Sequence, residues 1–174
     1  AWWLPLNKAQ LEAARLDRLL FFEIALATDG GIADAHGWPE RHTSLREAAG
    51  RRAAPRDRGR TLRGAGAFET RFSGPDAHAR LLDTAEGLAR DPQVSGLQLD
   101  VEVYAAVSAD SISGLREVVP ALSARLRALQ PRRALSLFVP PAQIGLYDAA
   151  TVAHADWAVM QAYDAHWAEA PEAK

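Results

Sequence analysis

One stretch of the chain, between Val94 and Tyr104, alternates strictly between apolar and polar residues. The apolar positions are Leu97, Leu99, Val101 and Val103, and the polar positions between them are Gln98, Asp100 and Glu102. A period of two is typical of a strand with two different faces. The pattern predicts a strand that carries the carboxylates Asp100 and Glu102 on one face. A strand with its acidic face in water would show the same alternation, so that interpretation stays open.

Helical spacing flanks this strand on both sides. The preceding helix is predicted to start at Ser73-Gly74-Pro75-Asp76 and to end at Asp91-Pro92. Its apolar positions are Leu81, Leu82, Ala85 and Leu88. The following helix has the clearest stripe, at Leu115, Val118, Val119, Leu122, Leu126 and Leu129. Helices on both sides of a strand favour a parallel sheet that is covered by helices. The carboxylates would then project into a barrel interior or crevice at the carboxyl end of the strand.

The remaining strands are predicted from short apolar runs. They are Trp2-Trp3-Leu4, Leu16–Ala27, Ala134–Val139 and Trp157–Tyr163, with a turn at Thr28–Gly31. Shorter helices are predicted at Lys8–Leu16, from Trp38-Pro39 onward, and within Tyr147–His154. Alternating helices and about six strand candidates indicate an α/β fold in a single domain over residues 1–174.

Two places fit this scheme less well. Glu23 is a carboxylate inside an apolar run, so it is either paired within the core or faces the same cavity as Asp100 and Glu102. Arg51–Arg63 stands where a third strand is expected, yet it is rich in arginine. We interpret it as a solvated or mobile charge run, because it has no interleaved aromatic residues for nucleic-acid stacking.

Composition excludes several kinds of function. The chain has 174 residues, 48% of them hydrophobic, and a formal net charge of −2, which favours neither nucleic acid nor an acidic membrane as a partner. It has no cysteine, so disulfides and thiolate chemistry are excluded. No apolar run approaches the roughly 20 residues that span a bilayer. No signal peptide is expected within the chain, and the cellular compartment stays open.

Two segments resemble glycoside hydrolase family 18, the chitinase-like (β/α)8 barrels. The family motif D-x-x-D-x-D-x-E at the end of the fourth strand is similar to Ser95–Glu102, in which Asp100 and Glu102 match and Ser95 and Gln98 replace the first two Asp residues. The family motif M-x-Y-D on the sixth strand is similar to Gln161–Asp164, in which Gln161 takes the Met position. The order of helices and strands is also similar.

The resemblance implies a retaining hydrolysis assisted by the N-acetyl group of the substrate, on a β-linked glycan and without a cofactor. Glu102 would act as general acid and then as base, and Asp100 would orient the N-acetyl group. Tyr163 would hydrogen-bond the acetamido oxygen. The residues expected to contact the sugar are Gln98, Gln161, Asp164 and Trp167, together with Glu23 if it faces the cavity. Two carboxylates close together raise the pKa of one of them, which would let Glu102 hold a proton.

Departures from the family pattern keep alternatives open. Gln98 can hydrogen-bond but cannot titrate. Strands seven and eight of the family barrel are missing from the chain, which ends at Lys174. The chain is therefore expected to be a fragment such as the N-terminal three quarters of a barrel, a barrel that another chain or segment completes, or a reduced variant of the fold. A second function class is a weak or inactive barrel that binds glycans or supports a larger protein. A metal site built from Asp100, Glu102, Asp164 and His166 is a third alternative, although nothing in the spacing demands a metal. The resemblance favours a secreted or periplasmic location.

Overall fold

The computed structural model describes residues 19–21, 24–40, 56–63, 65–103 and 106–160. Five parallel strands form one sheet in the order β1-β4-β5-β6-β7. Their bounds are Leu19–Phe21 (β1), Arg56–Arg63 (β4), Gly96–Glu102 (β5), Ala134–Val139 (β6) and Trp157–Met160 (β7). The predicted parallel α/β architecture is confirmed for this part of the chain.

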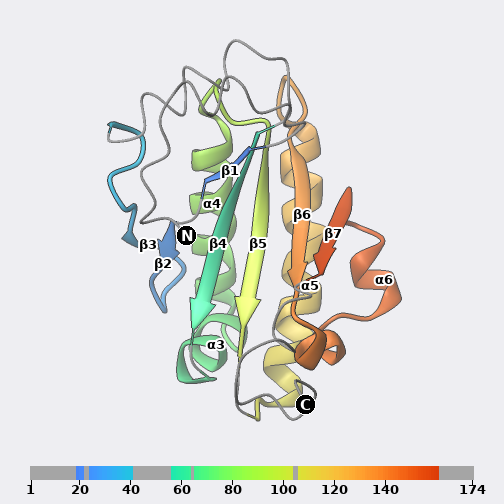
Figure 1. The fold of residues 1–174 in the computed structure, drawn as a ribbon. Coiled ribbons are helices and arrows are strands. Elements are labelled where there is room, and N and C mark those ends of the chain that lie inside the picture. Colours follow the sequence, from blue (N-terminus) through green and yellow to red (C-terminus); the bar gives the residue numbers. More distant parts are fainter. Residues whose placement is uncertain (1–18, 22–23, 41–55, 64, 104–105, 161–174) are drawn as a thin grey trace, which may run out of the picture.

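The helices between the strands are α3 (Ala65–Phe72), α4 (Pro75–Ala89), α5 (Ala109–Ala128) and α6 (Ala149–Val152), with a 3-10 helix, η2, at Pro141–Leu146. Two of them, α4 and α5, cover one face of the sheet (Figure 1). Figure 1 shows α4 and α5 behind the strands, on the same side of the sheet. Among the described residues, no helix is both long and apolar enough to cross a membrane.

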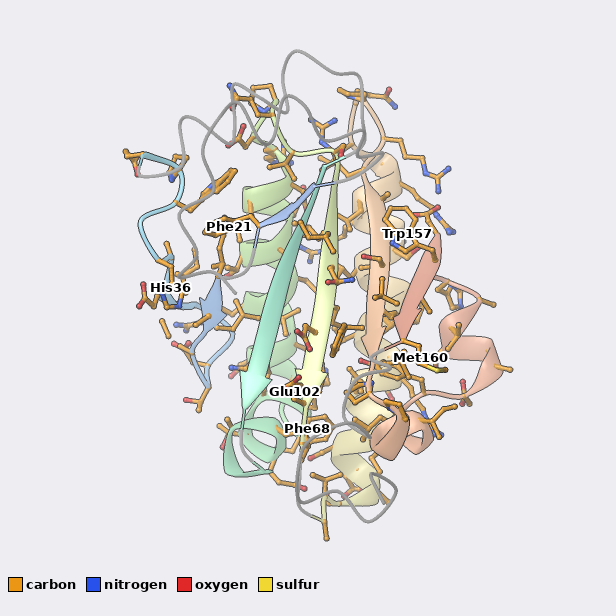
Figure 2. All side chains as sticks on the ribbon, viewed as in Figure 1. Phe21, His36, Phe68, Glu102, Trp157 and Met160 are labelled. Atoms are coloured by element: carbon orange, nitrogen blue, oxygen red, sulfur yellow. The ribbon has the colours of Figure 1, made fainter. Side chains whose placement is uncertain are left out.

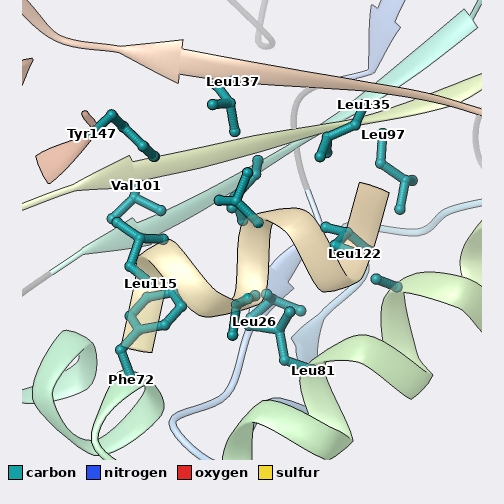
Figure 3. Close-up of a cluster of buried hydrophobic side chains, with 14 of the residues drawn as sticks. Leu26, Phe72, Leu81, Leu97, Val101, Leu115, Leu122, Leu135, Leu137 and Tyr147 are labelled. Carbon is teal, nitrogen blue, oxygen red and sulfur yellow. The ribbon is translucent and has the colours of Figure 1, made fainter. Parts of the chain in front are cut away.

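The hydrophobic core lies between this face of the sheet and the helices (Figure 3). The apolar stripe predicted for the long helix forms much of it, because its positions in α5 are buried. The buried members from α5 are Leu115, Val118, Val119, Leu122 and Leu126. They pack against the apolar positions of β5 and β6, which include Leu97, Val101, Leu135 and Leu137. The two strands and α5 therefore have the positions that the sequence predicts, and Ala134–Val139 agrees at both ends.

Two predictions for the N-terminal half are wrong. Leu16–Ala27 is not one strand, because β1 pairs with β4 whereas β2 (Ala25–Leu26) pairs with β3 (Ile32–Asp34) in a separate antiparallel hairpin. Arg51–Arg63 is not a mobile charge run along its length, since Arg56–Arg63 forms the strand β4, between β1 and β5. Main-chain hydrogen bonds to two neighbouring strands stabilise β4 independently of its low strand propensity.

The β2–β3 hairpin is held against α3 and α4. The predicted turn at Thr28–Gly31 is confirmed, with a positive φ of 88° at Gly30 and the Gly30 N–H bonded to the Ala27 carbonyl at 3.1 Å. Arg71 of α3, fully buried, donates to the Leu26 carbonyl at 2.9 Å and also to the Ala27 carbonyl. Burial lowers the pKa of Arg71 to about 10, while the charge of Asp29 acts in the opposite direction. One buried guanidinium therefore fixes the hairpin to the helical layer.

Candidate functional site

The three polar residues of β5 lie on the sheet face opposite the helices. Gln98 is only 5% exposed and Asp100 only 4% exposed, whereas Glu102, the last residue of the strand, is half-buried. Figure 2 shows Glu102 at the carboxyl end of β5. The alternative of an acidic strand face in water is wrong for Asp100, because that carboxylate is buried.

The three polar residues form a row along β5, and Ser136 of β6 lies beside it. Ser136 was not predicted from the sequence as a site residue. It is the Cα partner of Gln98, and its side chain is fully buried. Among the described residues, neither the Gln98 side-chain nitrogen nor the Ser136 hydroxyl has a hydrogen-bond partner. Buried polar groups of this kind are uncommon and call for an explanation. The signal was present in the sequence, because Ser136 is the one polar residue in the apolar run of β6.

Tyr147 is a second residue that the sequence analysis did not assign to the site. It follows η2, is 6% exposed, and its hydroxyl makes no hydrogen bond to any described residue. Burial raises the pKa of Tyr147, and the negative charge of Asp100 raises it further. Tyr147 is therefore a neutral phenol near the buried carboxylate.

The segment that follows Glu102 is anchored by a carboxylate from α3. Glu69 accepts hydrogen bonds from the Ser108 N–H at 2.5 Å, from the Ser108 hydroxyl at 2.6 Å and from the Ser111 hydroxyl at 2.6 Å. Ser108 is also the N-cap of α5, because its hydroxyl accepts from the Ser111 N–H at 3.1 Å. The bonds from Ser108 and Ser111 lower the pKa of Glu69.

The segment that follows β6 is anchored by an arginine of α5. Arg116 donates to the carbonyls of Leu146, at 3.2 Å, and Gly145, at 3.0 Å, and lies 3.4 Å from the Asp148 carboxylate. Asp148 caps α6 by accepting from the Thr151 N–H at 2.7 Å. The first half of α5 thus holds the segments after both β5 and β6, at the edge of the sheet where Glu102 lies.

The other predicted site residues lie outside the described part of the chain. They are Glu23, Gln161, Tyr163, Asp164 and Trp167. The proposed metal ligands Asp164 and His166 lie outside it as well. Within the described ranges, no three His, Asp or Glu side chains cluster in a way that could hold a metal ion.

Comparisons with known proteins identify the fold but not the family. No model of a protein family matches the sequence, and no curated protein matches it. Solved structures match it over most of its length. A sporulation-specific glycosylase, ydhD, from Bacillus subtilis is 22% identical with a TM-score of 0.72, and the alignment covers 92% of this chain and 55% of the other. A class V chitinase from Pseudomonas fluorescens Pf-5 is 17% identical with a TM-score of 0.75, covering 91% and 50%.

A Group IV chitinase from Ostrinia furnacalis in complex with allosamidin is also similar. It is 17% identical with a TM-score of 0.71, and the alignment covers 86% of this chain and 44% of that one. The chain spans about half the length of these solved chains. The parallel sheet with its helices is therefore part of the barrel fold seen in chitinases and related glycosylases, which confirms the predicted fold class.

Proposed function

We propose that the chain supplies the acidic residues of a glycosidase site that acts on β-linked, N-acetylated glycans. One observation carries the proposal. Gln98, Asp100 and Glu102 form a row on the sheet face opposite the helices, with the row running from buried to half-buried toward the carboxyl end of β5. Parallel α/β barrels place their catalytic groups at this end of the strands. The fold similarity to chitinases and a glycosylase supports the same assignment.

In the proposed mechanism, Glu102 begins the cycle protonated and donates its proton to the glycosidic oxygen. The carbonyl oxygen of the substrate's N-acetyl group attacks the anomeric carbon as the bond to the leaving group breaks. Asp100 orients the acetamido nitrogen and stabilises the positive charge that develops there. Water then attacks the anomeric carbon and transfers a proton to Glu102, while the bond between that carbon and the acetamido oxygen breaks. The two displacements together retain the configuration. The half-buried position of Glu102 suits this role, because the acid must reach both the substrate and water.

The other residues in this proposal rest on the family resemblance. Tyr163 is assigned to hydrogen-bond the acetamido oxygen, Gln161 and Asp164 to contact the sugar, and Trp167 to stack against a sugar ring. Glu23 is assigned a contact only if it faces the same cavity. A further chain or segment that completes the barrel also belongs to the proposal.

A second candidate function is glycan binding without turnover. The observation that favours it is the neutral, buried Gln98 next to Asp100 in the row. An amide cannot exchange a proton with Asp100 during a catalytic cycle. A binding module, in contrast, has no need for a carboxylic acid at the position of Glu102.

The test compares wild type with Glu102→Gln on a panel of 4-methylumbelliferyl β-glycosides that includes chitobiosides. The proposal expects wild-type turnover that the variant lacks, while both proteins bind allosamidin with similar affinity in calorimetry. Allosamidin is a suitable probe because one structurally similar chitinase was solved with it. Equal turnover in the two proteins would rule out Glu102 as the acid. Binding without turnover in wild type would favour the binding module.

A further inference from the structure

We infer that Glu69 is a positioning residue for Glu102, since it holds the segment that runs from β5 into α5. The inference rests on the proposed role of Glu102 as the catalytic acid. It starts from how the end of β5 is held in the sheet. On the β6 side, the ladder ends where Asp100 is paired with Phe138. On the β4 side it continues to the pair of Arg63 and Glu102. The β4–β5 ladder therefore extends as far as Glu102, two residues beyond the last pair of the β5–β6 ladder.

Glu69 follows the end of β4 closely along the chain. Helix α3 begins at Ala65, two residues after Arg63, and Glu69 lies on its second turn. Ser108 follows Glu102 by six residues and is the N-cap of α5. The strands β4 and β5 are thus joined twice, once by the ladder at Glu102 and again, beyond their ends, where Glu69 bonds Ser108 and Ser111.

A carboxylate suits this position because three donors converge on it. The Ser108 N–H and hydroxyl and the Ser111 hydroxyl all need an acceptor, and an ionised carboxylate accepts without donating. The two hydroxyl oxygens lie 3.0 Å apart, because both groups donate to the same oxygen of Glu69. The negative charge lies at the N-terminus of α5, where the helix dipole favours an anion. Ser111 is fully buried, so the network is anchored in the core.

Loss of this anchor is expected to act on turnover more than on binding. Freed from Glu69, the segment after Glu102 can shift, and the acid then loses its alignment with the glycosidic oxygen. A misplacement of about 1 Å can reduce turnover by about 100-fold. Substrate binding should change less, because it depends on many contacts around the site.

The experiment compares Glu69→Ala and Glu69→Gln with wild type and with a matched control, Asp83→Ala. Asp83 also joins two helices through a carboxylate, bonding Arg125 at 2.5 Å, but it contacts α5 in its last turn and is exposed. Two quantities are measured: the hydrogen exchange rate of the Ser108 amide, and kcat and KM on 4-methylumbelliferyl chitobioside.

The inference expects Glu69→Ala to exchange the Ser108 amide faster and to lower kcat by about 10- to 100-fold, with KM changed less than about threefold. Glu69→Gln should recover most of the turnover, because an amide oxygen still accepts, and Asp83→Ala should match wild type. If Glu69→Ala does not fold, Ser111→Ala, which removes one of the three bonds, should show the same pattern more weakly.

Two results would overturn the inference: wild-type exchange at Ser108 in Glu69→Ala, or faster exchange with unchanged kcat. A wild-type protein that hydrolyses no glycoside would instead contradict the proposed function. The exchange rate would then still decide whether Glu69 holds this segment.

Discussion

Gln98 of β5 and Ser136 of β6 are partners across the parallel ladder, and both bury a polar group that has no hydrogen-bond partner among the described residues. A buried polar group reduces stability when it loses its bonds to water without replacement. Two such groups lie side by side next to the polar row of β5, where the proposed function gives them a role other than stability. We therefore expect stability and activity to respond in opposite directions when they are replaced.

Gln98→Leu tests this expectation. The variant has similar volume and lacks the amide, so its free energy of unfolding should equal or exceed that of wild type, by up to about 1 kcal/mol. Glycosidase turnover should fall by about tenfold or more if the amide contacts Asp100 or the substrate. Urea denaturation and the chitobioside assay measure the two effects, and Ser136→Ala examines the neighbouring hydroxyl in the same way. A less stable but fully active Gln98→Leu would contradict the argument.

Gly114→Ala should destabilise the contact between three helices. A Cβ at Gly114 of α5 would lie 1.9 Å from the Phe72 carbonyl oxygen and 2.9 Å from the His78 ring, so helices must move apart. The expected loss is about 1–3 kcal/mol of unfolding free energy, as for other overpacked sites. Gly87→Ala in α4 is the matched control. A Cβ there meets nothing within 4 Å, so the variant should gain about 0.5–1 kcal/mol from helix propensity. Equal urea midpoints for the two variants would refute the packing argument.

Glu69→Gln should remove an acid-sensitive part of the stability. The bonds from Ser108 and Ser111 lower the pKa of Glu69 below its ordinary value of 4.5. A carboxylate with a lowered pKa stabilises the fold above pH 4.5, and the contribution is lost as the pH falls through the folded-state pKa. The difference in unfolding free energy between wild type and variant should therefore be largest above about pH 5 and shrink toward pH 3. Denaturation curves at several pH values measure it, and a constant difference would contradict the prediction.

Tyr147→Phe should make the protein more resistant to alkali. Burial, and then the charge of Asp100, raises the pKa of Tyr147 above its ordinary value of 10.0. The unfolded chain therefore ionises this phenol first, and wild type loses stability as the pH rises through about 10. The variant lacks this loss, so the stability difference should grow in its favour between pH 8 and pH 10.5. Urea denaturation at the two pH values tests it, and a phenol that titrates normally in the folded protein would contradict it.

The sequence predicted those elements whose side-chain pattern agrees with their position in the fold. β5 alternates because its two faces meet different surroundings, and α5 has its stripe because it covers the apolar face of the sheet. β4 could not be predicted, since Arg56–Arg63 has few strand-forming residues and is held by ladders with distant segments. Helix α3 is short, and its role depends on a contact between Glu69 and Ser108, 39 residues apart, which no local pattern reveals.

For the candidate site, the sequence predicted which residues of β5 share a face but not their neighbours. Ser136 and Tyr147 come from later segments, and only the folded sheet places them near Gln98 and Asp100. Nearly all basic residues of the chain are arginines, and the structure shows a use for two of them. Arg71 and Arg116 each donate to two backbone carbonyls, which the branched guanidinium can do and a lysine amine does less well.

The two-sided character of β5 also limits how this segment can change in evolution. Inserting or deleting one residue between Leu97 and Glu102 would turn every later side chain to the opposite face. The carboxylates would then enter the hydrophobic core between the sheet and the helices, and leucines would line the proposed site. The segments beyond the strand ends can vary in length without this exchange. We expect natural relatives to differ there by gaps, and along β5 by substitution only.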